Sequence, residues 1–144
     1  MKEFGHDKLS LANSRSRLRM VNLYQVAGSV SGIVVGTGNK VEDYGVGFYT
    51  KYGDGGVDIA PIADLYKTEV WELGKSLGVD SRIIEAKPTD GLWDDGRSDE
   101  DQLGASYEDL EYAMEYGTGP AVRVLHDFHA QNKHKMQPIP TFKL

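Results

Sequence analysis

The chain has 144 residues and a formal net charge of −6, from 16 Lys and Arg against 22 Asp and Glu. At roughly 150 residues per domain this length predicts one domain, and the acidic balance argues against a nucleic-acid binder. There are no cysteines, which excludes disulfides and thiolate sites and fits a cytoplasmic location. No apolar run approaches the ~20 residues of a membrane span, so we expect no membrane partner.

The first predicted helix covers residues 13–27. At 100° per residue, Met20, Val21 and Tyr24 fall on one apolar face with Arg17 in the middle of it. A guanidinium on an apolar face is costly unless it is paired. Arg17 therefore forms either a structural salt bridge or a clamp on a phosphate or carboxylate, and the pattern favours neither.

A short strand and a glycine turn follow this helix. Ile33–Val35 predicts a buried parallel strand, and GTGNK at 36–40 predicts the turn after it. Ligands bind at the carboxyl ends of strands in open α/β sheets, and glycine-turn amides can cradle phosphate or ribose. Taken alone, the turn is more typical of an ordinary tight turn, because it matches neither a dinucleotide fingerprint nor a Walker A loop. Because one strand cannot make a sheet, we expect the chain to be part of a larger domain or to borrow strands.

The next segment, after a short helical start at 41–44, is a glycine-rich loop over 45–63. Loops of this length are usually functional or disordered. Lys51 and Asp58 within it could bind charged groups or ribose hydroxyls, although a solvated turn explains them equally simply.

A helix over 65–77 comes next, with Asp64 as its predicted N-cap and Gly78 as its end. Lys67 in its first turn opposes the helix dipole, which hints at an anionic partner.

The remaining predicted elements are helices separated by an acidic loop. They are a turn near 82–85, the loop through Asp101, a helix over 107–116 capped by Ser106 and Asp109, and a last helix from Pro120 to about Gln131. His126 and His129 are spaced as a pair of metal ligands could be, but no third ligand is evident, which disfavours a metal site there.

Six segments, in this order, resemble ammonia-dependent NAD synthetases. They are RSRLRM at 15–20, GTGNKVE at 36–42, FYTKYGDGGVDIAPIADLYKTEV at 48–70, KPTDGLW at 87–93, SDEDQLGASYEDLE at 98–111 and HKM at 134–136. The TKYGDGG block and its distance from GTGNK are the most specific part. The resemblance implies an α/β fold, the C-terminal portion of a doubly wound, adenine-nucleotide hydrolase-like domain of the N-type ATP pyrophosphatases. It further implies that this portion is mostly helical, with few parallel strands.

The resemblance also implies an activity: ATP-dependent amidation of deamido-NAD by ammonia, through an acyl adenylate, in a homodimer. The residue roles that it implies are ATP contacts at Thr37, Lys67 and Thr89, deamido-NAD contacts at Arg17, Lys51, Asp58, His134 and Lys135, and a Mg²⁺ ligand at Glu42. A carboxylate suits Mg²⁺, which takes hard oxygen ligands.

The sequence departs from the family pattern in two places. The Ser-Gly-Gly-x-Asp-Ser loop that grips pyrophosphate is absent, and there is one residue more between Glu42 and Lys51 than in many relatives. We therefore expect residues 1–144 to be one incomplete C-terminal domain portion with little activity alone. Two alternatives stay open: the synthetase portion of a glutamine-dependent NAD synthetase, and a non-catalytic nucleotide-binding or dimerisation module.

Overall fold

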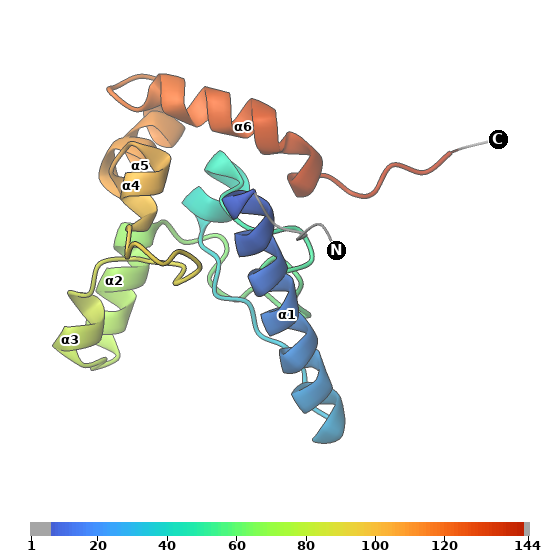
Figure 1. The fold of residues 1–144 in the computed structure, drawn as a ribbon. Helices are drawn as coiled ribbons and strands as arrows, with labels where there is room; N and C mark the ends of the chain where they lie inside the picture. The colour runs from blue at the N-terminus through green and yellow to red at the C-terminus, as the bar shows by residue number, and fades with distance from the viewer. Residues whose placement is uncertain (1–6, 143–144) are drawn as a thin grey trace.

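The computed structural model describes residues 7–142, whose regular elements are all helical (Figure 1). In chain order they are α1 (Lys8–Ser29), the π-helix η1 (Val41–Val46), α2 (Lys67–Ser76), α3 (Ser81–Ile84), α4 (Asp99–Leu103), α5 (Tyr107–Tyr116) and α6 (Val122–Met136). The helix α1 stands apart from the pair α2–α3, and the segment between residues 30 and 66 runs between them. No helix among the described residues combines the length and the apolar character needed to cross a membrane.

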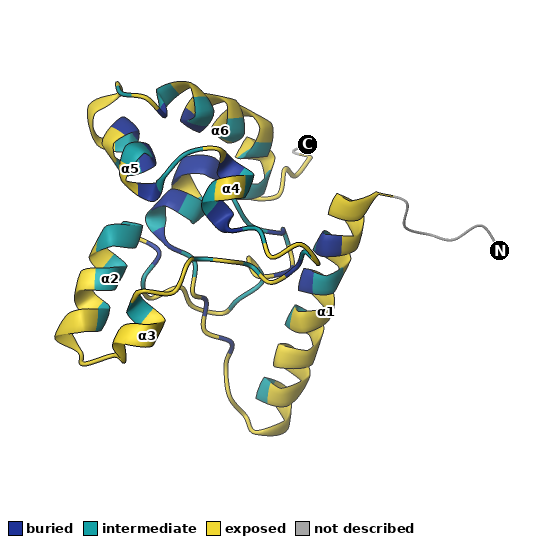
Figure 2. Cartoon of the chain, turned by 60° about the vertical axis from the view of Figure 1, so that its left-hand side comes forward, coloured by how far each residue is buried: buried dark blue, intermediate teal, exposed yellow. Residues whose placement is uncertain are grey.

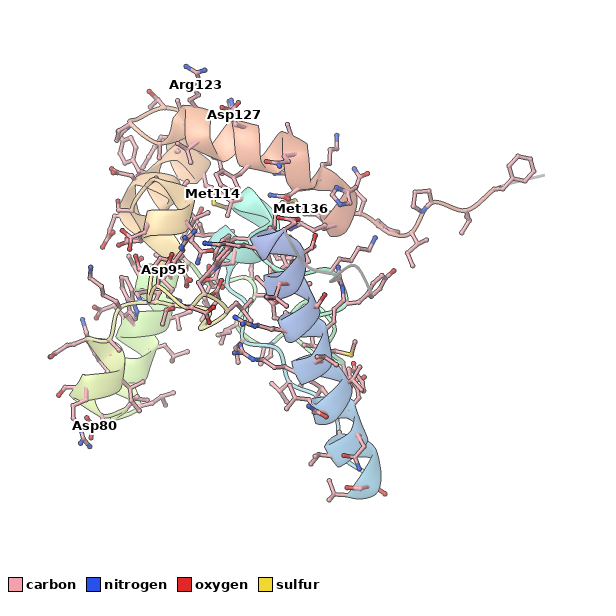
Figure 3. The ribbon with its side chains drawn as sticks, in the orientation of Figure 1. Asp80, Asp95, Met114, Arg123, Asp127 and Met136 are labelled. Atoms are coloured by element: carbon pink, nitrogen blue, oxygen red, sulfur yellow. The ribbon has the colours of Figure 1, made fainter. Side chains whose placement is uncertain are left out.

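The hydrophobic core lies where η1 meets α4, α5 and α6. It is built from small and medium apolar side chains around one buried tyrosine: Val41, Val46, Leu103, Tyr107, Leu110, Ala113, Ala121 and Leu125. Figure 2 shows this buried group at one end of the molecule. Met114 of α5 packs against Gly45 of η1 so closely that a Cβ there would lie 2.6 Å from its sulfur (Figure 3). Core contact of this kind fixes η1 in place.

Helix α6 holds η1 through side chains on one face. His129 Nδ1 contacts the carbonyl of Gly45 at 2.9 Å, Asn132 donates to the carbonyl of Val46 at 2.9 Å, and Lys135 donates to the carbonyl of Gly47 at 2.6 Å. The carbonyls at the end of a helix have no partner within it. The side chains of α6 therefore supply the hydrogen-bond partners that these carbonyls lack within η1. His129 has a structural role in this arrangement.

The long helix α1 begins earlier than predicted because Asp7 caps it, accepting from the backbone of Leu9 and Ser10. Only Ala12 and Ser16 are buried along it, and its apolar side chains are exposed (Figure 2). Val21 and Tyr24, on the apolar face that carries Arg17, are thus exposed to solvent among residues 7–142. Met20 on the same face is half-buried and lies close to Gly56.

The predicted buried strand at Ile33–Val35 is also wrong in its extent. The described residues contain a single parallel bridge, Val35 to Ile59, in place of a strand. Val34 is buried, but Ile33 and Val35 are 60% and 51% exposed. A strand needs partners on its edges and layers on its faces, and the described residues supply neither.

Three helix boundaries differ from prediction. Helix α2 starts after Tyr66, whose amide donates to Glu69, so Asp64 is not its N-cap. The acidic stretch predicted as loop contains α4, which a capping box between Ser98 and Asp101 begins. Helix α6 starts two residues after Pro120 and runs to Met136, five residues past its predicted end.

Candidate functional site

A cavity of about 1110 Å³, here called the main cavity, opens between the helices and loops of the described residues. Its walls come from α1, the segments 34–37 and 47–57, α2, the 88–102 segment and α6. Eight of the nine predicted site residues line it: Arg17, Thr37, Glu42, Lys51, Lys67, Thr89, His134 and Lys135. Residues spread over most of the chain thus face one space.

Glu42 occupies the buried end of the main cavity. Its Oε1 accepts a hydrogen bond from the Tyr107 hydroxyl at 2.6 Å and pairs with Lys67 Nζ at 3.4 Å. Both charged side chains are well covered, with 14% and 20% of their surfaces exposed. The turn positions this carboxylate locally, because Asn39 Oδ1 accepts from the amides of Val41 and Glu42 and so starts η1. Lys67 also lies 5.0 Å from the centre of the Tyr107 ring, a cation–π distance.

A second carboxylate, that of Asp99, also lies near the Tyr107 hydroxyl. Its Oδ2 is 3.5 Å from the Tyr107 hydroxyl, and the residue is only 7% exposed. Its Oδ1 is buried and has no hydrogen-bond partner among the described residues. Burial raises the pKa of Asp99 to about 6, helped by the negative charges of Glu42 and Asp90. Burial, together with Glu42, also raises the pKa of Tyr107, which therefore stays protonated as a donor.

A smaller recess of about 280 Å³ lies beside the main cavity and contains Asp43. This carboxylate lies against Gly38, where any Cβ would collide with its oxygens. Burial raises the pKa of Asp43 to about 6, with further contributions from Glu42 and Asp54.

The basic residues gather at the opposite rim. Arg17 is exposed and its Nε donates to the Lys51 carbonyl at 3.2 Å, and within residues 7–142 it forms no salt bridge to a carboxylate. Lys51 Nζ lies 3.5 Å from the His134 carbonyl, and burial lowers the pKa of Lys135. Three cations and one histidine at one rim suit an anionic ligand.

Two threonines face the cavity from loops. Thr37 is exposed in the turn after the parallel bridge. Thr89 donates to the Arg97 carbonyl at 3.2 Å and accepts from the Gly91 amide at 3.3 Å, which shapes its loop. Arg15 and Arg19, which point away from the face that carries Arg17, hold this loop through the carbonyls of Leu92, Asp90 and Gly91.

The ninth predicted residue, Asp58, lies outside the main cavity. Its Oδ2 accepts from the Val34 amide at 2.7 Å, next to the parallel bridge. Its predicted ligand contact stays a prediction.

The sequence pattern assigned no role to Asp43 or Tyr107, and it favoured a solvated acidic loop over a cation site for the run that contains Asp99. The segment SDEDQLGASYEDLE contains two of the three, and the local signal in it is only the pair of capping boxes. The raised pKa values of Asp99 and Tyr107 depend in part on Glu42, which is far away in the sequence, so no local pattern could show them.

Comparison with known proteins identifies relatives of this chain. The model of the family described as NAD synthase matches residues 2–139. The NH(3)-dependent NAD(+) synthetase of Carboxydothermus hydrogenoformans is 44% identical over 131 residues, which cover 91% of this chain and 52% of that protein. The NH(3)-dependent NAD(+) synthetase of Thermococcus kodakarensis is 53% identical over 108 residues, covering 75% and 42%.

Solved structures give the same result. The NMN synthetase from Francisella tularensis matches with a TM-score of 0.88 and 35% identity, over 97% of this chain and 59% of that one. The NH3-dependent NAD synthetase from Campylobacter jejuni matches with a TM-score of 0.70 and 26% identity, over 99% and 58%. The chain spans about half the length of the curated relatives it matches. On the strength of the family match and these relatives, the chain belongs to the NAD synthase family.

Proposed function

We propose that this chain supplies the nucleotide-binding portion of an enzyme that uses ATP and ammonia to convert the carboxylate of deamido-NAD into the amide of NAD. The observation that carries the proposal is the covered Glu42–Lys67 pair beside the glycine turn at 36–40, inside a cavity large enough for nucleotides. The relatives named as NH(3)-dependent NAD(+) synthetases support the same activity.

ATP would lie against the turn and α2. Thr37 and the amides of the turn offer donors to phosphate oxygens, and Lys67 offers a positive charge that is already partly desolvated. Thr89 closes the same side from its loop. The ion pair between Lys67 and Glu42 would then weaken as the Lys67 ammonium forms contacts with the phosphates.

Deamido-NAD would lie toward the basic rim. Arg17 and Lys51 are suited to its pyrophosphate or carboxylate, and His134 and Lys135 at the end of α6 would cover it. Asp58 would have to give up its bond to the Val34 amide, or bind a ribose hydroxyl through its other oxygen.

The residues present also fit a divalent cation. Glu42 supplies a hard oxygen ligand inside the cavity that would hold the phosphates. Mg²⁺ usually takes one or two carboxylates and completes its shell with phosphate oxygens and water. When bound here, it would neutralise charge on the departing pyrophosphate.

The chemistry would run in two steps. A nicotinate carboxylate oxygen attacks the α-phosphorus of ATP, the bond to the β-phosphate oxygen breaks, and pyrophosphate leaves. Ammonia then attacks the acyl carbon, AMP leaves, and the extra proton passes to solvent. The contribution of this chain is positioning and charge neutralisation: Lys67 at the phosphates, and Arg17 and Lys51 at the second nucleotide.

A mononucleotide substrate is the second candidate, and the similarity to an NMN synthetase at a TM-score of 0.88 favours it. Both candidates have the same reacting carboxylate and differ in the group attached to the ribose phosphate.

We further propose that the chain works as one part of a longer, doubly wound domain in a cytoplasmic homodimer. The apolar side chains exposed along α1 support this, among them Leu18, Val21, Leu23 and Val26 at 55–64% exposure. Exposed apolar patches of this kind usually mark an interface.

Calorimetry with ATP and with each nicotinate nucleotide would test the proposal. We expect the chain to bind ATP, Lys67→Ala to weaken that binding about tenfold through loss of one phosphate contact, and Lys75→Ala, an exposed lysine of the same helix, to leave it unchanged. Failure to bind ATP, or equal effects of the two variants, would overturn the assignment.

Turnover is tested by joining the chain to the unmatched half of the Carboxydothermus hydrogenoformans relative. We expect amide formation with ammonium, and negligible formation by the chain alone. ATP binding without turnover in the joined protein would favour a non-catalytic module.

A further inference from the structure

The side chain of Asp99 is buried with one oxygen that has no hydrogen-bond partner among residues 7–142. The residue is 93% buried, and the oxygen in question is Oδ1. Its backbone amide donates to the Pro88 carbonyl at 2.9 Å, so the main chain fixes its place. The cap of α4 comes from Ser98, which accepts from the Asp101 amide. Burying an ionised carboxylate without partners is costly, so the position calls for a compensating group.

The charge around Tyr107 is unbalanced by one. Its hydroxyl has a single proton, which goes to Glu42 at 2.6 Å, and Asp99 Oδ2 at 3.5 Å is left without a good donor. Two carboxylates thus meet at one hydroxyl, and Lys67 is the cation whose charge acts on Asp99 as well as on Glu42. One lysine cannot neutralise two buried carboxylates.

Glu42, Lys67 and Asp99 line the main cavity together with Thr37. A ligand in that cavity could therefore reach the carboxylates. A divalent cation there would neutralise the one excess negative charge and would keep a positive charge that could attract phosphate. Asp99 belongs to α4 and Glu42 to η1, so such a cation would also tie these two core elements together.

We propose that Asp99 is a second protein carboxylate for the divalent cation that Glu42 is expected to hold, with the Tyr107 hydroxyl keeping the two carboxylates apart. This inference rests on the cation site within the proposed function. It adds a residue and a defined coordination partner to that site.

The test uses Mn²⁺ as the probe, with its binding followed by electron paramagnetic resonance of the free ion. The variants are Asp99→Asn and, as a control, Asp127→Asn on the outer side of α6 (Figure 3). We expect Asp99→Asn to weaken Mn²⁺ binding at least tenfold and the control to leave it unchanged. In EDTA, the melting temperature of Asp99→Asn should stay equal to that of the unmodified chain or rise, because an uncompensated buried charge is gone.

Mn²⁺ affinity of Asp99→Asn within about twofold of the unmodified chain would overturn the inference. So would a chain that binds no Mn²⁺. If Asp99→Asn folds poorly, Tyr107→Phe, which removes one oxygen atom, provides a second test. We expect the Mn²⁺ affinity of Tyr107→Phe to fall, and an unchanged affinity would count against the arrangement. Because Lys67-dependent ATP binding is measured without Mn²⁺, the inference can fail while the proposed function stands.

Discussion

Replacing Asp43 by Asn should stabilise the chain near neutral pH and leave its stability almost unchanged in acid. The carboxylate lies in a recess against Gly38, and burial raises its pKa from 3.8 to about 6, with Glu42 and Asp54 adding to the shift. Asn has nearly the same shape and cannot ionise. The substitution therefore removes the electrostatic cost and keeps the packing.

The magnitude follows from the shift. Each pKa unit corresponds to about 1.4 kcal/mol, so the shift sets a ceiling of about 3 kcal/mol. The recess is open to solvent, which screens the charge and reduces the expected gain to about 1–2 kcal/mol. Because the folded pKa lies above the unfolded one, the folded chain binds the extra proton. Stability is thus lost as pH rises from about 4 to about 6, and the Asn variant avoids that loss.

Urea unfolding in EDTA at about pH 4 and about pH 7.5 would measure this difference. With a denaturant slope of about 2 kcal/mol per molar urea, the midpoint of Asp43→Asn should rise by about 0.5–1 M at the higher pH and by much less at the lower. Asp127→Asn, exposed on α6, should shift neither midpoint by more than about 0.3 M. A lower midpoint for Asp43→Asn at neutral pH, or equal shifts at both pH values, would refute the reasoning.

Three further variants test the site and its support. In the joined protein, Glu42→Gln should lower activity about 10²-fold or more and recover in part at raised Mg²⁺, and full activity at limiting Mg²⁺ would contradict the metal role. Arg17→Ala should raise the KM for the nicotinate nucleotide at least about threefold more than that for ATP, in steady-state assays of both substrates, because its guanidinium lies at the basic rim. Gly53→Ala should destabilise the chain by about 1–3 kcal/mol in urea unfolding, because its Cβ would collide with Ser16, whereas Gly28→Ala, with open space around it, should not.

How much the sequence could predict depends on the range of the interactions. The helix over 107–116 matches the structure at both ends, because Ser106 caps it and Gly117 ends it, and both signals are local. The start of α2 was misplaced because Glu111, on another helix, accepts from the Thr68 amide and hydroxyl. A partner 43 residues away has no counterpart in the local pattern.

In the candidate site, too, residues with a local sequence signal could be predicted and residues that depend on long-range contacts could not. The glycine turn and Lys67 could be singled out from spacing and dipole arguments, and the resemblance supplied Thr89, His134 and Lys135. Tyr107 could not be found in this way, because a buried tyrosine in a helix normally indicates packing. Only the fold brings its hydroxyl to Glu42.

The π-helix η1 also bears on the extra residue between Glu42 and Lys51. Its turn closes from the Gly47 amide to the Glu42 carbonyl, five residues apart, whereas an α-helical turn closes over four. A wider turn stores one additional residue without lengthening the element. We therefore expect the length change to be confined to η1, so that the cavity residues before and after it keep their positions. A member of the family could therefore gain or lose one residue in η1, and the distances between its cavity-lining side chains would stay the same.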